Sequence, residues 1–183
     1  MKLAIGMTAA LLAVTWPCIA AEDTGKKVDF DVYNGYFESN RSGLKGEASY
    51  LAFTDMDSFR RVFGIGRVLG NRQRFLPRDA FDTRTVVAVI KRGNRIWSYE
   101  VRGVTARGQT LTVSYHETSQ DGGSARFASP LIPSVPKGKY SKVVFIANGK
   151  KAGTATIEDR PTTSRAADRV FVALKPEPLP SGP

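Results

Sequence analysis

Arginine side chains gather in one stretch of this 183-residue chain and are its best-equipped groups for binding a ligand. Between positions 60 and 78 the sequence holds six arginines and no acidic residue. A guanidinium group is planar, and its N–H groups form a fork that matches a phosphate or a carboxylate. More basic residues surround the next expected turn, where an aromatic ring is available for stacking. The residues predicted to bind are Arg67, Arg72, Arg74, Arg78, Arg92, Arg95 and Trp97.

These residues support two binding hypotheses and one structural alternative. If several of them share a face, the partner is an acidic patch on a protein, or it is a polyanion or an anionic lipid surface. The turn at 92–97, together with 67–78, is the expected contact surface. Nucleic acid is not expected, because the sequence has no recognisable nucleic-acid motif and its start indicates export. The alternative is an ordinary solvated surface, since neighbours in sequence need not share a face of the fold.

The sequence contains few residues of the types and spacing that catalysis requires. A single histidine excludes a multi-histidine metal centre, and a single cysteine excludes a thiol-rich one. His116 follows Tyr115 in an alternating segment, which predicts an exposed imidazole. A Ser-His-Asp triad would have to combine His116 with Asp121, yet the chain lacks a Gly-x-Ser-x-Gly elbow. We therefore predict no catalytic residue, and a hydrolase is the least favoured alternative.

Two acidic pairs have the spacing found in some calcium loops. They are Asp29 with Asp31 and Asp55 with Asp57, and neither continues to the distal glutamate that completes such a loop. Asp55 and Asp57 also have an explanation at the start of a helix. No metal and no cofactor are therefore expected.

The first residues are typical of a cleaved secretory signal. A lysine at position 2 precedes an apolar run at 3–14, and small residues follow at Ala20 and Ala21, where a signal peptidase would cut. This run is shorter than the roughly 20 residues of a membrane-spanning helix. Lipid attachment at Cys18 is the alternative. The mature chain is expected to be periplasmic or secreted, without a transmembrane segment.

The binding residues must be positioned by a mainly β domain. Apolar residues make up 42% of the chain, enough for a core, and the formal net charge is +10. The pattern predicts an α+β fold, with an antiparallel sheet or sandwich and one short helix near residues 55–63. Thr54 is expected to cap this helix and Gly64 to end it. Residues 64–83 are expected to form a long, structured loop.

Hydrophobic patterns place the strands. A continuous apolar run at 85–90 predicts a strand covered on both faces, whereas alternation at 111–116 predicts one buried and one wet face. Asn148-Gly149 predicts a hairpin between 143–147 and 155–157. Glycines and prolines predict an irregular stretch from 122 to 136. A last strand is expected at 170–174.

The expected domain organisation has four parts. The predicted segments are the signal peptide at 1–20, a flexible lead-in at 21–29, one β-rich domain at 30–174 and a disordered, proline-rich tail at 175–183.

Part of the chain resembles the C-terminal domain of the PrcB-like proteins, a family named after an accessory subunit of a bacterial surface protease complex. The resemblance covers roughly residues 82–145 and lies in the order of features. These are the strand at 86–90, the Trp-Ser-Tyr-Glu-Val run at 97–101, the strand at 108–113, the Tyr-His-Glu-Thr-Ser run at 115–119, Ser-Pro at 129–130 and Val-Pro-Lys at 135–137.

This resemblance implies a non-catalytic, extracytoplasmic β domain that binds protein, as an accessory of a protease or another envelope complex. It carries over no catalytic residue. The turn at 92–97 departs from the family pattern, because it keeps one glycine and lacks the proline of the family's Pro-Thr-Gly-Gly-Tyr-like run. If this turn binds the partner in the family, this chain is expected to bind a different partner.

Overall fold

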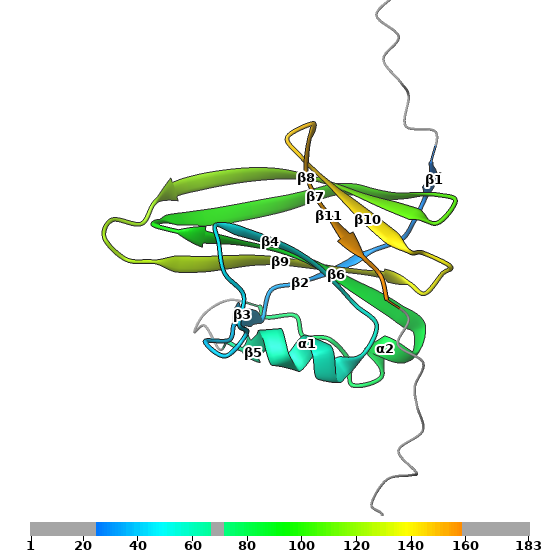
Figure 1. Cartoon of the computed structure of the whole chain (residues 1–183), viewed down its shortest axis with the longest axis horizontal. Coiled ribbons are helices and arrows are strands. Elements are labelled where there is room, and N and C mark those ends of the chain that lie inside the picture. Colours follow the sequence, from blue (N-terminus) through cyan, green and yellow to red (C-terminus); the bar gives the residue numbers. More distant parts are fainter. Residues whose placement is uncertain (1–24, 67–71, 159–183) are drawn as a thin grey trace, which may run out of the picture.

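The computed structural model describes residues 25–66 and 72–158, which build three stacked layers (Figure 1). The outer layer is a five-stranded sheet, called sheet A. Its strands, in spatial order, are β1 (Lys26–Lys27), β7 (Arg95–Arg107), β8 (Thr110–Asp121), β10 (Lys142–Ala147) and β11 (Lys150–Thr156).

The middle layer is a four-stranded sheet, called sheet B. Its order is β2 (Asp31–Tyr33), β9 (Phe127–Pro136), β6 (Arg84–Gly93) and β4 (Ala48–Phe53). The third layer lies below it in Figure 1 and contains two helices and one strand pair. These elements are α1 (Met56–Val62), α2 (Ala80–Thr83), β3 (Tyr36–Glu38) and β5 (Phe63–Ile65). The prediction of a mainly β, α+β fold is confirmed.

Strand β6 is buried on both faces because sheet B is the middle layer. Residues 86–90 are all 0% exposed. Successive side chains of a strand point to opposite faces, so Val87 and Val89 join the core against sheet A, while Val86, Ala88 and Ile90 join the core against the third layer. The continuous apolar run in the sequence reflects this double burial.

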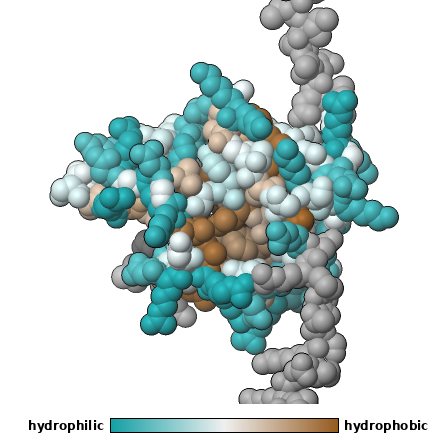
Figure 2. Space-filling model, viewed as in Figure 1, coloured by the Kyte–Doolittle hydropathy of each residue, from teal (hydrophilic) through white to brown (hydrophobic). Residues whose placement is uncertain are grey.

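Aromatic rings fill the core of the third layer. Phe59 of α1 is 1% exposed, and its ring centroid lies 5.0 Å from that of Tyr36 and 4.9 Å from that of Phe63. Leu51 and Met56 at the border of this core are only partly buried. Figure 2 shows the corresponding apolar surface between β4 and α1, surrounded by hydrophilic side chains.

The helix near 55–63 is present, but its ends differ from the prediction. Asp55 is the N-cap, and its Oδ1 accepts a hydrogen bond from the Ser58 backbone N–H at 2.7 Å. Thr54 instead donates its hydroxyl to the carbonyl of Glu158. The helix ends at Val62 and β5 begins at Phe63, so Gly64 does not stop the helix. Gly64 lies under the Phe37 ring, where a Cβ atom would be 2.7 Å from Phe37 Cζ.

Two stretches expected to be irregular contain regular structure. Residues 64–83 contribute part of β5 and all of α2, and residues 122–136 contain β9. The prolines of β9 concealed the strand, because proline is depleted in sheets. Strand β9 has β2 as its neighbour only at 132–134, so Pro130 and Pro136 lie where its outer side is a sheet edge, the position that accepts proline, whereas Pro133 lies opposite Val32 of β2.

The strands were predicted to be antiparallel, whereas sheet A is mixed, because β8 and β10 pair in parallel. The chain leaves sheet A after β8, crosses sheet B as β9 and returns as β10. It therefore enters β10 from the same end as β8. The predicted Asn148-Gly149 hairpin joins β10 to β11, with φ angles of 50° and 80°.

The predicted lead-in is partly ordered. Lys26 and Lys27 form β1 against Ala106 and Thr105 of β7, and Val28 donates its N–H to Val104. The predicted signal peptide, the expected strand at 170–174 and the proline-rich tail lie outside the described residues. Within 25–66 and 72–158, neither helix has the length and apolar composition needed to cross a membrane.

Candidate functional site

Two neighbouring cations on β6, Lys91 and Arg92, point to opposite faces of sheet B. Lys91 faces sheet A and forms an ion pair with Glu117 of β8. Arg92 faces the third layer and forms an ion pair with Glu38 of β3. The alternation of side chains along a strand separates these two residues, although they are adjacent in the sequence. Their basic stretch is therefore not one surface.

Arg92 holds the loop at 39–47 in place. Its Nε and Nη2 donate to the two Glu38 carboxylate oxygens at 2.6 and 2.8 Å, and its Nη1 donates to Ser49 Oγ and to the carbonyl of Gly46. Ser42 adds a 2.7 Å hydrogen bond from its hydroxyl to Glu38. The side chains of Arg92 and Glu38 are 12% and 8% exposed. The Arg92 guanidinium is thus engaged in an internal network, and its predicted role as a ligand-binding cation stays a prediction.

The Lys91–Glu117 ion pair lies between sheets A and B, at the same end of the molecule as Arg92 and Glu38. Lys91 Nζ lies 4.0 Å from the centroid of the Trp97 ring, a cation–π contact within the chain. The Trp97 backbone N–H donates to Ser129 Oγ, and the Tyr99 hydroxyl donates to the Ser129 carbonyl at 2.9 Å. The half-buried Trp97 thus packs on Lys91, whereas the sequence predicted a ring available to a ligand.

Two tyrosines near this second ion pair are buried, Tyr115 almost completely and Tyr99 partly. Burial, followed by the nearby Glu117 carboxylate, raises the pKa of Tyr99 and of Tyr115 far above the ordinary value. Their rings meet edge to face, with centroids 5.9 Å apart. Both hydroxyls are therefore neutral at physiological pH.

Alkaline pH is expected to destabilise the fold through these tyrosines. Their pKa values are raised in the folded state, so the two tyrosines stabilise the fold fully below about pH 10, where an unfolded tyrosine titrates. This stabilisation falls as the pH rises further. Among the six tyrosines of the chain, Tyr99 and Tyr115 should ionise late, together with unfolding. Tyrosinate absorbance and circular dichroism, followed in one pH titration, measure this. Ionisation of all six near pH 10 with the fold intact would contradict it.

The other predicted binding residues have partners of their own or lie in other places. Arg74 pairs with Asp31 of β2 at 2.6 Å, and Arg95 donates to Ser119 Oγ at 2.8 Å. The β9 partners of Asp31 and Arg92 are Ser134 and Ala128, six positions apart, which is roughly 20 Å along a strand.

The predicted set therefore occupies at least two places. Arg92, Arg95 and Trp97 belong to the end where β6 meets β7, and Arg74 lies beside β2. Arg72 and Arg78 are exposed, and Arg67 lies outside the described residues.

The buried Arg92–Glu38 pair forms the floor of an open groove. Two depressions, each of about 400 Å³, adjoin along Glu38, Asn40, Arg92 and Ala128. The first continues along the loop at 39–45, and the second is bounded by the start of β9 and by the ring of an exposed β3 residue. We call this surface the Arg92 groove; its further lining residues are Ser39, Ser42, Gly43, Leu44 and Lys45 on one side and Phe37, Arg126 and Phe127 on the other.

The free charges of the Arg92 groove are positive. Arg92 and Glu38 neutralise each other, and no ion pair joins Lys45 or Arg126 to any residue in the described part of the chain. Phe37 is 47% exposed, so an apolar ring lies in the same groove. Sequence reasoning missed these residues, because they come from segments about 90 positions apart that only folding brings together.

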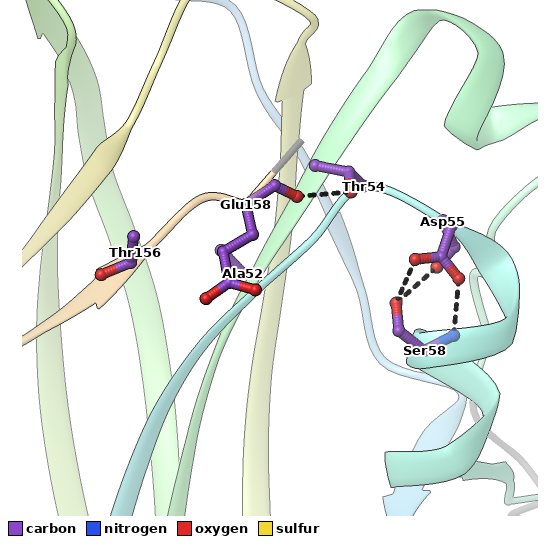
Figure 3. A pocket seen from close by; sticks show the side chains of 6 residues that line it. All are labelled: Ala52, Thr54, Asp55, Ser58, Thr156 and Glu158. Carbon is purple, nitrogen blue, oxygen red and sulfur yellow. Dashed lines mark hydrogen bonds between the residues drawn. The ribbon is translucent and has the colours of Figure 1, made fainter. Parts of the chain in front are cut away.

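A smaller hollow of about 140 Å³ lies between the start of α1 and the end of β11 (Figure 3). Both oxygens of the Asp55 carboxylate accept hydrogen bonds from Ser58, which lower its pKa although burial opposes this. Glu158 extends away from Asp55. The Asp55 carboxylate is occupied by its capping role, so the hollow is a weaker candidate than the Arg92 groove.

His116, the one histidine, is exposed on the outer face of β8, across from Glu100 of β7. Its predicted orientation toward solvent is confirmed. No group of three or more His, Cys, Asp or Glu side chains suited to a metal ion occurs among residues 25–66 and 72–158.

Comparison with models of protein families, with curated proteins and with solved structures found no match. The resemblance to PrcB-like proteins is therefore still a prediction from sequence.

Proposed function

We propose that this chain is an exported, non-catalytic domain that binds another protein through the Arg92 groove, as an accessory subunit of an envelope or protease complex. The observation that carries the proposal is the groove itself, in which two cations with no ion pair in the described part of the chain and an exposed aromatic ring flank the Arg92–Glu38 ion pair. The signal-like start of the sequence supports export.

The composition and rigidity of the groove favour protein binding. Arginine and aromatic side chains are enriched in protein interfaces and dominate their binding energy. Arg126, Phe37 and Phe127 supply both types. The Arg92–Glu38 network fixes the floor and one wall before a partner arrives, which reduces the entropy lost on binding.

Site-specific photo-crosslinking tests the proposal. A photoreactive phenylalanine analogue replaces Phe37, in the full chain expressed in its native cells, and the matched control carries it at Thr154, on the outer face of β11. We expect one crosslinked species of defined mass from position 37 and none from position 154. Equal crosslinking from both positions, or none from position 37, would refute binding through the groove.

A further inference from the structure

We propose that the Arg92 groove binds an extended acidic segment of its protein partner, with carboxylates at Lys45 and Arg126 and an apolar side chain against Phe37 and Phe127. This inference rests on the proposed function and specifies the chemistry of the partner. Three observations carry it: the charge of the groove, the difference between its halves and a polar group at its centre.

The charge of the groove selects an anion. Its lining contains Lys45, Arg92 and Arg126 against one carboxylate, that of Glu38. Glu38 accepts hydrogen bonds from Arg92 and Ser42 on a side chain that is 8% exposed, so it offers little to a ligand. Complementary charge steers association and selects partners. A basic segment would meet two unpaired cations of its own sign.

The two halves of the groove differ in the side chains that line them. The half along residues 39–45 has two serines beside Leu44 and ends at Lys45, whereas the other half combines two aromatic rings with Arg126. An apolar side chain fits the aromatic half, where burial of its surface adds to the charge attraction. A sequence with glutamate or aspartate on both sides of an apolar residue satisfies both halves.

Asn40 lines both depressions at the centre of the groove. It is exposed, and its side-chain amide makes no hydrogen bond within the described residues. An amide offers both a donor and an acceptor, which matches the peptide groups of an extended chain. The backbone of a helix is already hydrogen-bonded, so the amide favours an extended segment.

Fluorescence anisotropy with the mature full-length chain tests the inference. The probe is a labelled peptide with one phenylalanine flanked by glutamates, and the comparison peptide has glutamine in place of every glutamate. We expect the acidic peptide to bind at least about tenfold more tightly, with affinity that falls as salt rises. The substitutions Lys45→Glu and Arg126→Glu together should remove this preference.

The matched control is Arg107→Glu with Lys142→Glu, an equal change of charge on the outer face of sheet A, and it should leave binding unchanged. Phe37→Ser should weaken binding of the acidic peptide without affecting that of a glutamate peptide lacking phenylalanine. Equal affinity for the glutamine peptide would overturn the inference. Equally tight binding of a heparin oligosaccharide to the groove would also overturn it, in favour of a general anion site.

The two proposals can fail separately. A crosslink from position 37 to a partner whose contact segment is not acidic would support protein binding through the groove. It would contradict the inference that the bound segment is acidic. Specific peptide binding without any cellular crosslink would support the chemistry of the groove and reject its use in the native complex.

Discussion

Replacement of Glu38 by alanine will lower the free energy of unfolding by about 3–5 kcal/mol, because it leaves the Arg92 guanidinium buried without a carboxylate. The same substitution removes the acceptor for Ser42, so the loop at 39–47 should loosen as well. Urea denaturation measures the stability, and limited proteolysis within 39–47 measures the loop.

Glu100→Ala is the matched control for this prediction. Glu100 also pairs with an arginine, Arg102, but both side chains are about 60% exposed, and such pairs contribute about 0–1 kcal/mol. The double variant Glu38→Leu with Arg92→Met should recover much of the loss, since apolar residues can replace a buried ion pair. If Glu38→Ala lowers the free energy of unfolding no more than Glu100→Ala does, the Glu38 carboxylate is not needed to stabilise the Arg92 guanidinium in the fold.

Replacement of Lys91 by methionine is expected to cost about 3–5 kcal/mol of stability, since Glu117 would then be buried without its cation. Glu117 has little other support, because its buried Oε2 has no hydrogen-bond partner among residues 25–66 and 72–158. Methionine keeps most of the apolar stem that packs near Trp97, so the loss reports mainly on charge.

A double-mutant cycle with Glu117→Gln separates the ion pair from general damage to the core. We expect Lys91→Met to be much less harmful in the Glu117→Gln background, because no buried carboxylate is left uncompensated. Thermal unfolding of the four proteins gives the coupling energy. A coupling energy near zero would mean that the two side chains contribute independently.

The sequence predicted those elements whose signal is local. The strand at 84–93 was found because its apolar run reports burial on both faces, and the wet and buried faces of β8 were found from the alternation of Leu111, Val113 and Tyr115. The Asn148-Gly149 turn and the short helix also carry local signals, in backbone preference and in the spacing of apolar residues.

Elements whose form depends on distant partners were missed. Strand β9 looked irregular because proline is depleted in sheets, and two of its prolines, Pro130 and Pro136, lie where β2 does not extend along it, which is a property of the sheet. The parallel pairing of β8 with β10 follows from the path of β9 through the other sheet.

The sequence alone determined that this is a mainly β domain rich in basic side chains, because composition and hydrophobic period act over short stretches of chain. Only the tertiary structure decided what each cation does. Arg92 pairs with Glu38, 54 residues away in the sequence, and Lys91 pairs with Glu117, 26 residues away. These two adjacent cations therefore form ion pairs beside different cores. Lys45 and Arg126, which no motif marked, have no ion pair within the described residues and line the groove that also contains Phe37, because a charge is satisfied or left available by its neighbours in space.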